Sequence, residues 1–299
     1  MHKELTMTAS VIGFYVALAT WAAVGVWGYT AKKWLPFFLF GLAFALYLNG
    51  RYVLTGIENG ITHMTGVFDI VAHTGVAEGE KPATLIPCST GDNNCTISAD
   101  YDTHPAWVVA FHERFMSGPS WRGPLLIGHI LMNTIALVII TLQLFRPGDK
   151  FPAHKMLGRI AVVSVLISLT CAGILNAELI DVPGYGGIWA MTGLYFLMLT
   201  LVVPMAIGVY KIVKGDAEGH RIWMWRTAGA IWGSYWIFRG IMMLIDLFVK
   251  DTVGLTLSVS AWTAGLIGIA SAEAIRRYLD NKNGVPNLAT SHGRSLGTA

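Results

Sequence analysis

Two histidines stand directly before long apolar segments of the sequence, and each has an arginine close behind it. His154 is followed by Arg159, and His220 is followed by Arg226. We expect both imidazoles to lie at the same depth on different helices, which is what six-coordinate haem iron, or a Zn or Cu ion, requires. The arginines would then pair with haem propionates. The alternative is that these histidines and arginines only cap the spans and contact lipid headgroups.

A second set of polar residues falls inside apolar segments, near their opposite ends. Ionisable groups at membrane depth are costly and usually face the protein interior, so they are candidates for function. Spacings of four and seven residues place members of the set on shared helix faces. The set is His129, Asn133, Arg239, Asp246, Glu178, Asn49, Arg51 and Asn176.

Arg239 needs a negatively charged partner in such surroundings, and we expect Glu178 or Asp246 to supply it. The result is either a structural ion pair between spans or a pocket for a ligand or cofactor. His129 has three candidate roles, namely axial ligand, proton-transfer group, or hydrogen-bond donor to Glu178. Asn133 would support it from the same helix face.

The elements that position these residues are membrane-spanning helices. Of the 299 residues 54% are hydrophobic and only 13% are charged, whereas a soluble domain has about 25% charged residues. Apolar runs of about 20 residues are long enough to cross a bilayer as helices. This composition excludes a soluble enzyme, a nucleic-acid-binding protein and a disordered chain. We expect an all-α bundle of about seven transmembrane helices in contact with membrane lipids, at 8–29, 34–54, 124–145, 156–179, 187–209, 222–249 and 253–275.

The basic residues predict how this bundle is oriented. They collect in alternate connections, at 32–33, 146–159, 211–226 and 276–282. Because Lys and Arg are enriched in cytoplasmic loops, all four connections belong in the cytoplasm. The N-terminus is then outside, the C-terminus is cytoplasmic, and the chain is a multi-pass protein of the bacterial cytoplasmic (inner) membrane.

Four parts of the chain follow from these spans. Residues 1–55 hold two N-terminal helices, 56–121 an extracytoplasmic connection, 122–278 a five-helix core and 279–299 a disordered cytoplasmic tail. Cys88 and Cys95 lie close together in the extracytoplasmic connection, where an oxidising compartment favours a disulfide between them. The alternative is two free thiols or half of a metal site.

Four short motifs resemble a known family. They are Gly-His-Ile-Leu-Met-Asn at 128–133, Ala-His-Lys-Met-Leu-Gly-Arg at 153–159, Gly-His-Arg-Ile-Trp-Met-Trp-Arg at 219–226 and Ile-Phe-Arg-Gly at 237–240. The series is similar to the bacterial membrane proteins grouped as domain of unknown function 2306, over roughly residues 120–250. This resemblance implies a family and no activity.

The helix layout also resembles, by architecture alone, the four-helix b-type cytochromes and ferric reductases. Those proteins present paired histidines at both depths. In this sequence only the inner pair, His154 and His220, is complete, since His129 has no intramembrane histidine partner. The resemblance therefore implies one haem rather than two.

These observations favour three functions. The first is electron transfer by haem b held by His154 and His220, with His129 at an outer quinone or cofactor site and a quinone or redox protein as partner. The second is a small-solute or proton-coupled transporter whose polar pathway is His129, Arg239, Glu178 and Asp246. The third is an accessory subunit, without chemistry of its own, in a larger membrane complex.

Overall fold

The computed structural model describes residues 2–60, 114–115, 118–145, 153–179, 186–246, 248 and 253–282, and every regular element in these ranges is helical. The elements are α1 (His2–Thr30), α2 (Leu35–Thr55), α5 (Arg122–Leu144), α6 (His154–Ala177), α7 (Gly187–Val213), α8 (Ala217–Trp232), the π-helix η3 (Gly233–Ile237), α9 (Phe238–Asp246) and α10 (Val253–Lys282). Six helices are long and apolar enough to cross a membrane, one of them formed by α8, η3 and α9 together. The apolar part of α1, Val16–Thr30, is shorter. The predicted polytopic all-α bundle is therefore confirmed.

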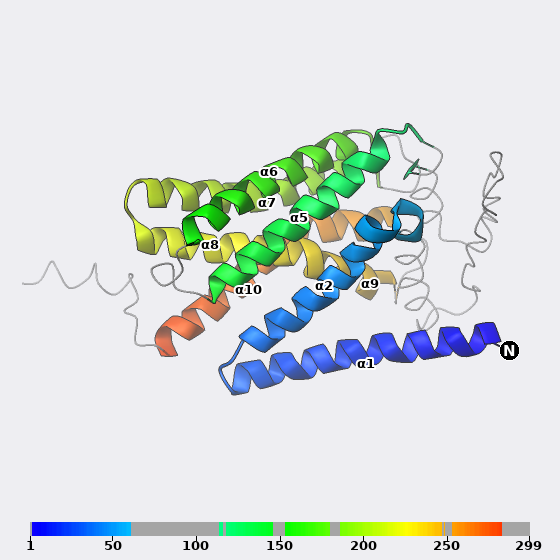
Figure 1. Ribbon diagram of the computed structural model, residues 1–299, viewed down its shortest axis with the longest axis horizontal. Helices are drawn as coiled ribbons and strands as arrows, with labels where there is room; N and C mark the ends of the chain where they lie inside the picture. Colours follow the sequence, from blue (N-terminus) through cyan, green and yellow to red (C-terminus); the bar gives the residue numbers. More distant parts are fainter. Residues whose placement is uncertain are drawn as a thin grey trace, which may run out of the picture.

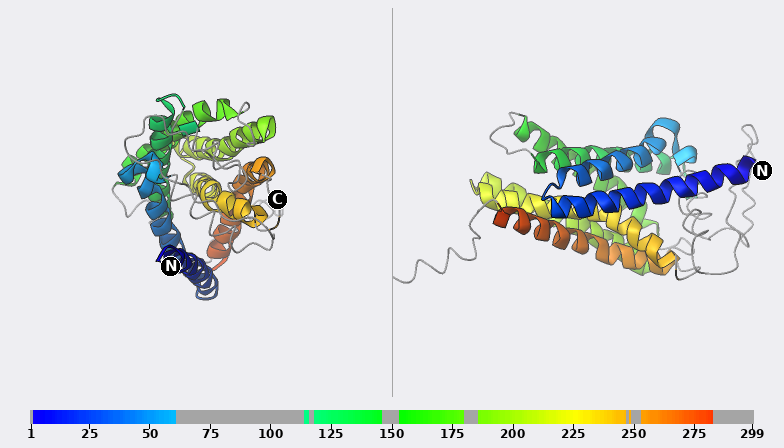
Figure 2. Two further views of the ribbon diagram at one scale, coloured as in Figure 1. Left: turned by 90° about the vertical axis from the view of Figure 1, so that its right-hand side faces the viewer. Right: turned by 90° about the horizontal axis from the view of Figure 1, so that it is seen from below.

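The bundle has two tightly packed groups of helices (Figure 1). Helices α5 and α6 pack against each other along most of their length, and α7, α8 and α10 pack against one another. Helix α2 lies on α5, and α1 lies against α2 at the periphery of the bundle (Figure 2). The contacts that join α6 to α7 are few by comparison. Residues that face the space between these groups therefore come from both of them.

Small residues allow α8 and η3 to approach α10 closely. A Cβ added to Gly233 would lie 2.5 Å from the carbonyl oxygen of Ala264, and one added to Gly229 would lie 2.6 Å from the Cβ of Ala272. Gly268 meets the backbone of Gly229 in the same way. Membrane helices associate through such contacts because lipid provides no hydrophobic force between them.

Buried hydrogen bonds join α2, α5 and η3. Asn49 donates from Nδ2 to Thr134 Oγ1 at 2.6 Å and accepts at Oδ1 from the Tyr235 hydroxyl at 3.0 Å. One turn earlier, the indole of Trp232 donates to Thr141 Oγ1 at 3.0 Å. These contacts satisfy polar groups that would be costly if left unpaired in an apolar interior. They also fix η3 relative to α5.

The helix boundaries can be compared with the expected division of the chain. Helix α2 ends at Thr55 and α5 begins at Arg122, and the division into four parts stays a prediction. Helix α10 continues to Lys282, beyond the expected start of the tail at residue 279. Cys88 and Cys95, with the disulfide predicted between them, lie outside the described residues.

Candidate functional sites

An inner cavity of about 310 Å³ lies between the two groups of helices. Five of the polar residues predicted to lie inside the spans line it, namely Asn49, His129, Asn133, Asn176 and Arg239. Its wall is mostly apolar, with leucines from α6, α7 and α10. The polar side chains that line it are Asn49, Arg114, His129, Asn133, Asn176, Ser234, Tyr235 and Arg239. A mostly apolar cavity with a few convergent polar groups is the usual form of a small-molecule site.

His129 is held on one side of its ring by Ser168. Its Nδ1 lies 2.9 Å from the Ser168 hydroxyl and 3.1 Å from the Ser168 carbonyl oxygen, and the hydroxyl donates back to the His129 carbonyl at 3.1 Å. Because a carbonyl only accepts, we assign the proton of the neutral ring to Nδ1. Nε2 is then a hydrogen-bond acceptor on a residue that lines the cavity. The expected hydrogen bond from His129 to Glu178 is replaced by this one.

Arg239 enters the cavity from the start of α9, just after the π-helix. Its Nη1 donates to the Tyr235 carbonyl at 2.8 Å, and its guanidinium carbon lies 4.2 Å from the centre of the Tyr235 ring. Its Nε is buried and has no hydrogen-bond partner, and no carboxylate pairs with it, among the residues described. Of the two partners predicted for Arg239, Glu178 pairs with Arg122 and Arg114 instead. The side chain of Asp246, the other expected partner, lies outside the described part of the chain.

Glu178, which directly follows α6, instead pairs with two arginines at this end of the bundle. Arg122 Nε lies 2.8 Å from Glu178 Oε2, and Arg114 Nη2 lies 3.7 Å from the same oxygen. Arg114 also donates to the Leu175 carbonyl. The sequence analysis did not select either arginine, although the position of Arg122 immediately before an apolar run was a usable signal.

The π-helix determines which residues reach the cavity. A π-helical turn holds one residue more than an α-helical turn, so it rotates every side chain that follows it, and such turns often occur at functional sites. Ser234, Tyr235, Phe238 and Arg239 all line the cavity from η3 and the first turn of α9. A regular α-helical pattern in the sequence does not reveal this change in rotation.

Arg51 does not belong to this site. Its side chain is exposed, stacks over the Tyr47 ring at 5.5 Å and contacts the Tyr47 hydroxyl at 3.5 Å. Helix α2 presents Asn49 to the cavity instead, two residues earlier along the chain. Asn133 does line the cavity, one turn after His129.

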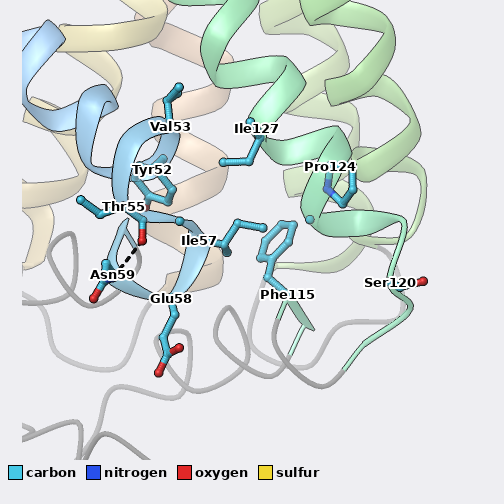
Figure 3. A pocket seen from close by; sticks show the side chains of 12 residues that line it. Tyr52, Val53, Thr55, Ile57, Glu58, Asn59, Phe115, Ser120, Pro124 and Ile127 are labelled. Carbon is cyan, nitrogen blue, oxygen red and sulfur yellow. Dashed lines mark hydrogen bonds between the residues drawn. The ribbon is translucent and has the colours of Figure 1, made fainter. Parts of the chain in front are cut away.

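A second cavity, of about 540 Å³, opens between the end of α2 and the start of α5. Figure 3 shows Tyr52, Ile57, Phe115, Pro124 and Ile127 around it. Phe115 lines the inner cavity as well. The polar side chains that line this second cavity are Tyr52, Thr55, Glu58, Asn59 and Ser120, and none of the predicted site residues lies in it.

At the opposite end of the bundle, the structure brings His154 and His220 together. Their ring centres are 6.4 Å apart and their planes are almost perpendicular, at 89°. The Nδ1 of His220 lies 2.9 Å from the Gly208 carbonyl oxygen, so we assign it a proton, which leaves Nε2 with a free lone pair. The Nδ1 of His154 is buried and has no hydrogen-bond partner among the described residues.

The two arginines expected beside this pair differ in their surroundings. Arg226 lies over the Trp223 ring at 4.4 Å and pairs with Glu273 at 3.4 Å. Arg159 is exposed on α6 and pairs with no carboxylate in the part of the chain that the structure describes. Within the same ranges, no group of three or more His, Cys, Asp or Glu side chains is placed to hold a metal ion. A centre at His154 and His220 would therefore have two ligands from the described part of the chain.

A family of predicted membrane proteins, DUF2306, matches residues 126–275 of this chain. The chain belongs to the DUF2306 family. The matched region runs from α5 into α10 and includes His129, Arg239, His154 and His220, while α1 and α2, which carries Asn49, precede it. Comparison with curated proteins and with solved structures gives no match. Membership of DUF2306 confirms the resemblance seen in the sequence motifs and leaves the function to be argued from the two sites.

Proposed function

We propose that this DUF2306 protein transfers electrons in the bacterial cytoplasmic membrane through one haem b, with His154 and His220 as axial ligands. The observation that carries the proposal is the convergence of two imidazoles from different helices, with ring centres 6.4 Å apart. Basic residues in alternate loops place this end of the bundle on the cytoplasmic side. The electron donor or acceptor would be a quinone or a redox protein.

The separation of the two rings fits a single metal between them. A ligating imidazole nitrogen lies about 2 Å from its metal and about 1 Å in front of its ring centre, so two rings on opposite sides of one metal have centres about 6 Å apart. The observed distance is close to this value. The perpendicular planes are compatible with ligation because each imidazole can turn about its own metal–nitrogen bond.

The hydrogen bond of His220 and the unpartnered ring nitrogen of His154 also support ligation. Metal-binding histidines usually donate their second ring N–H to a carbonyl or carboxylate, which fixes the tautomer. His220 makes this bond to Gly208. The buried Nδ1 of His154, which has no partner in the described structure, is an unsatisfied polar atom of the kind that a missing group would satisfy.

When bound, haem supplies reversible one-electron transfer, and the protein supplies ligands and electrostatics. Gln143 donates from Nε2 to the His154 carbonyl at 2.9 Å, which positions the first turn of α6. Arg159 would pair with one propionate, and Arg226 would pair with the other in place of Glu273.

The test is the absorption spectrum of the purified protein, oxidised and then reduced with dithionite. We expect a sharp b-type band in the reduced protein that is lost in His154→Ala and His220→Ala. His129→Gln is the matched control, because it removes a half-buried histidine of the same bundle that is not assigned to the haem, and it should keep the band. A band that survives both His154→Ala and His220→Ala would contradict the proposal. A flat spectrum from protein made with ample haem would also contradict it.

The transporter hypothesis has less support from the geometry. It needs a continuous polar pathway through Glu178, yet this carboxylate is bound to Arg122 at the outer end of the bundle. The accessory-subunit hypothesis needs an unoccupied contact face, and two tryptophans of the Trp-rich helix α8, Trp225 and Trp232, are buried inside the bundle instead.

A further inference from the structure

The geometry points to a second site, independent of any haem, in which the cavity between His129 and Arg239 binds a small amphipathic carboxylate or similar oxyanion. The cavity lies in the half of the bundle that the basic residues place outside. Its wall combines leucine side chains with two guanidinium groups, and one of these, Arg114, is paired with Glu178. The charge of Arg239 remains, so the cavity matches a ligand with an apolar body and one anionic head.

The charge of Arg239 is the main reason to expect an anion. A guanidinium group remains charged in proteins, and a charge removed from water is costly unless it is paired. The side chain of Arg239 is half-buried, and its Nε is fully buried. Among the described residues, Arg239 makes one hydrogen bond, to the Tyr235 carbonyl, and stacks on that tyrosine. Neither contact neutralises it, and no carboxylate of the described chain does so. An anion in the cavity would supply the missing charge.

The donors that Arg239 leaves unused favour a planar oxyanion. Nε is buried without a partner in the described structure, and Nη1 is the nitrogen bound to Tyr235. Nε and Nη2 form the edge of a guanidinium group that can bind both oxygens of a carboxylate in a bidentate pair. The structural alternative, in which Arg239 only satisfies a carbonyl of the π-helix, uses one donor of five.

Two further polar groups on the cavity wall have spare acceptors. Asn176 donates from Nδ2 to the Met191 carbonyl at 2.9 Å, while its Oδ1 is buried without a partner among the described residues. His129 presents the lone pair of Nε2, since Ser168 holds its Nδ1. Both can accept a hydrogen bond from water or from a hydroxyl group on the ligand. The polar wall is therefore incomplete without an occupant.

The size of the cavity limits the occupant. Pockets for small molecules measure about 300–1,000 Å³, and 310 Å³ is at the lower end of this range. A single short chain or one ring fits such a volume, whereas a whole two-chain phospholipid does not. The anion can come from a free short-chain carboxylate or from the headgroup phosphate of a lipid whose tails stay in the bilayer.

Binding of radiolabelled octanoate to the full chain in phosphatidylcholine nanodiscs tests the proposal. Octanamide has the same tail without the charge and should bind at least about tenfold more weakly, because hydrogen bonds between charged groups are lost. Arg239→Gln should remove this preference, with circular dichroism used to check its fold. Arg239→Lys keeps the charge and loses the bidentate geometry, so it should show an intermediate preference. Arg51→Gln is the matched control, since it removes an exposed arginine outside the cavity, and should bind as the unmodified protein does.

A second arm identifies the source of the anion. If a lipid headgroup occupies the site, nanodiscs with phosphatidylglycerol should raise the melting temperature of the unmodified protein and of Arg51→Gln, but not that of Arg239→Gln. Saturable octanoate binding in phosphatidylcholine would identify a free carboxylate. The proposal is overturned if the unmodified protein binds octanoate no better than octanamide and phosphatidylglycerol gives no stabilisation that depends on Arg239. Neither arm requires haem, so the outcome is separate from the test of His154 and His220.

Discussion

The pairing of Glu178 decides whether Arg239 is available to a ligand, and a double-mutant cycle measures it. In the structure Glu178 lies 2.8 Å from Arg122 Nε, with the two side chains 33% and 20% exposed. Two unit charges at that distance attract by roughly 6 kcal/mol at an effective dielectric constant of about 20. Desolvation and partial exposure cancel most of this attraction, and we expect a coupling of about 1 kcal/mol.

The first cycle uses Arg122→Gln, Glu178→Gln and the double variant. A second cycle uses Arg239→Gln, Glu178→Gln and their double variant. Unfolding in mixed micelles of dodecyl sulfate and maltoside, followed by circular dichroism, gives the free energy of unfolding for each protein. The cycle with Arg239 should be additive within about 0.5 kcal/mol, because the two groups share no contact in the described structure. A coupling that is larger for Arg239 than for Arg122 would refute the arrangement and remove the argument for an anion in the cavity.

Three further substitutions test individual contacts. Ser168→Ala should lower the free energy of unfolding by about 1 kcal/mol, because it removes the hydroxyl bonded to His129; an unchanged value would show that this bond is unimportant. Gly268→Leu should lower the melting temperature strongly because α8 leaves no space for a side chain, while Gly240→Leu, with nothing within 4 Å of its Cβ position, should not; equal effects would contradict the close helix crossing. Asp216 caps α8 directly before the candidate span that begins at Ala217. Its pKa is lowered mainly by the hydrogen bond from the Gly219 amide and also by Lys211. The ionised Asp216 carboxylate therefore stabilises the fold above about pH 4, and this stabilisation is lost as the pH falls through the lowered pKa. The melting temperature of Asp216→Asn, measured against pH, should lack this acid-dependent loss, and an unchanged pH profile would contradict the cap.

The helices and their limits could be predicted because they depend on local composition. Apolar runs and interrupting charges located α2, α5, α6 and α7 within a few residues, and the membrane imposes helices on any such run. The same reasoning placed His154 and His220 at a common depth, because each stands at the first turn of a helix that starts on the same side. The depth of a residue depends on its position along a span, and that position can be read from the sequence.

The pairings across the bundle could not be predicted, because they depend on how each helix is rotated. The π-helix at Gly233–Ile237 changes the direction of every side chain after it, including that of Arg239. Arg51 and Asn49 are two residues apart, and only Asn49 faces the cavity. Ser168 was not among the predicted site residues, yet it is the partner of His129. These outcomes require the three-dimensional packing of at least three helices.

The haem content of the purified protein tests the central claim most directly. Protein produced with ample haem, extracted and assayed by the pyridine haemochrome method, should contain one haem b per chain. The inner pair His154 and His220 accounts for one group and no more. Protein that is fully folded by circular dichroism and contains no haem, or two per chain, would contradict the account.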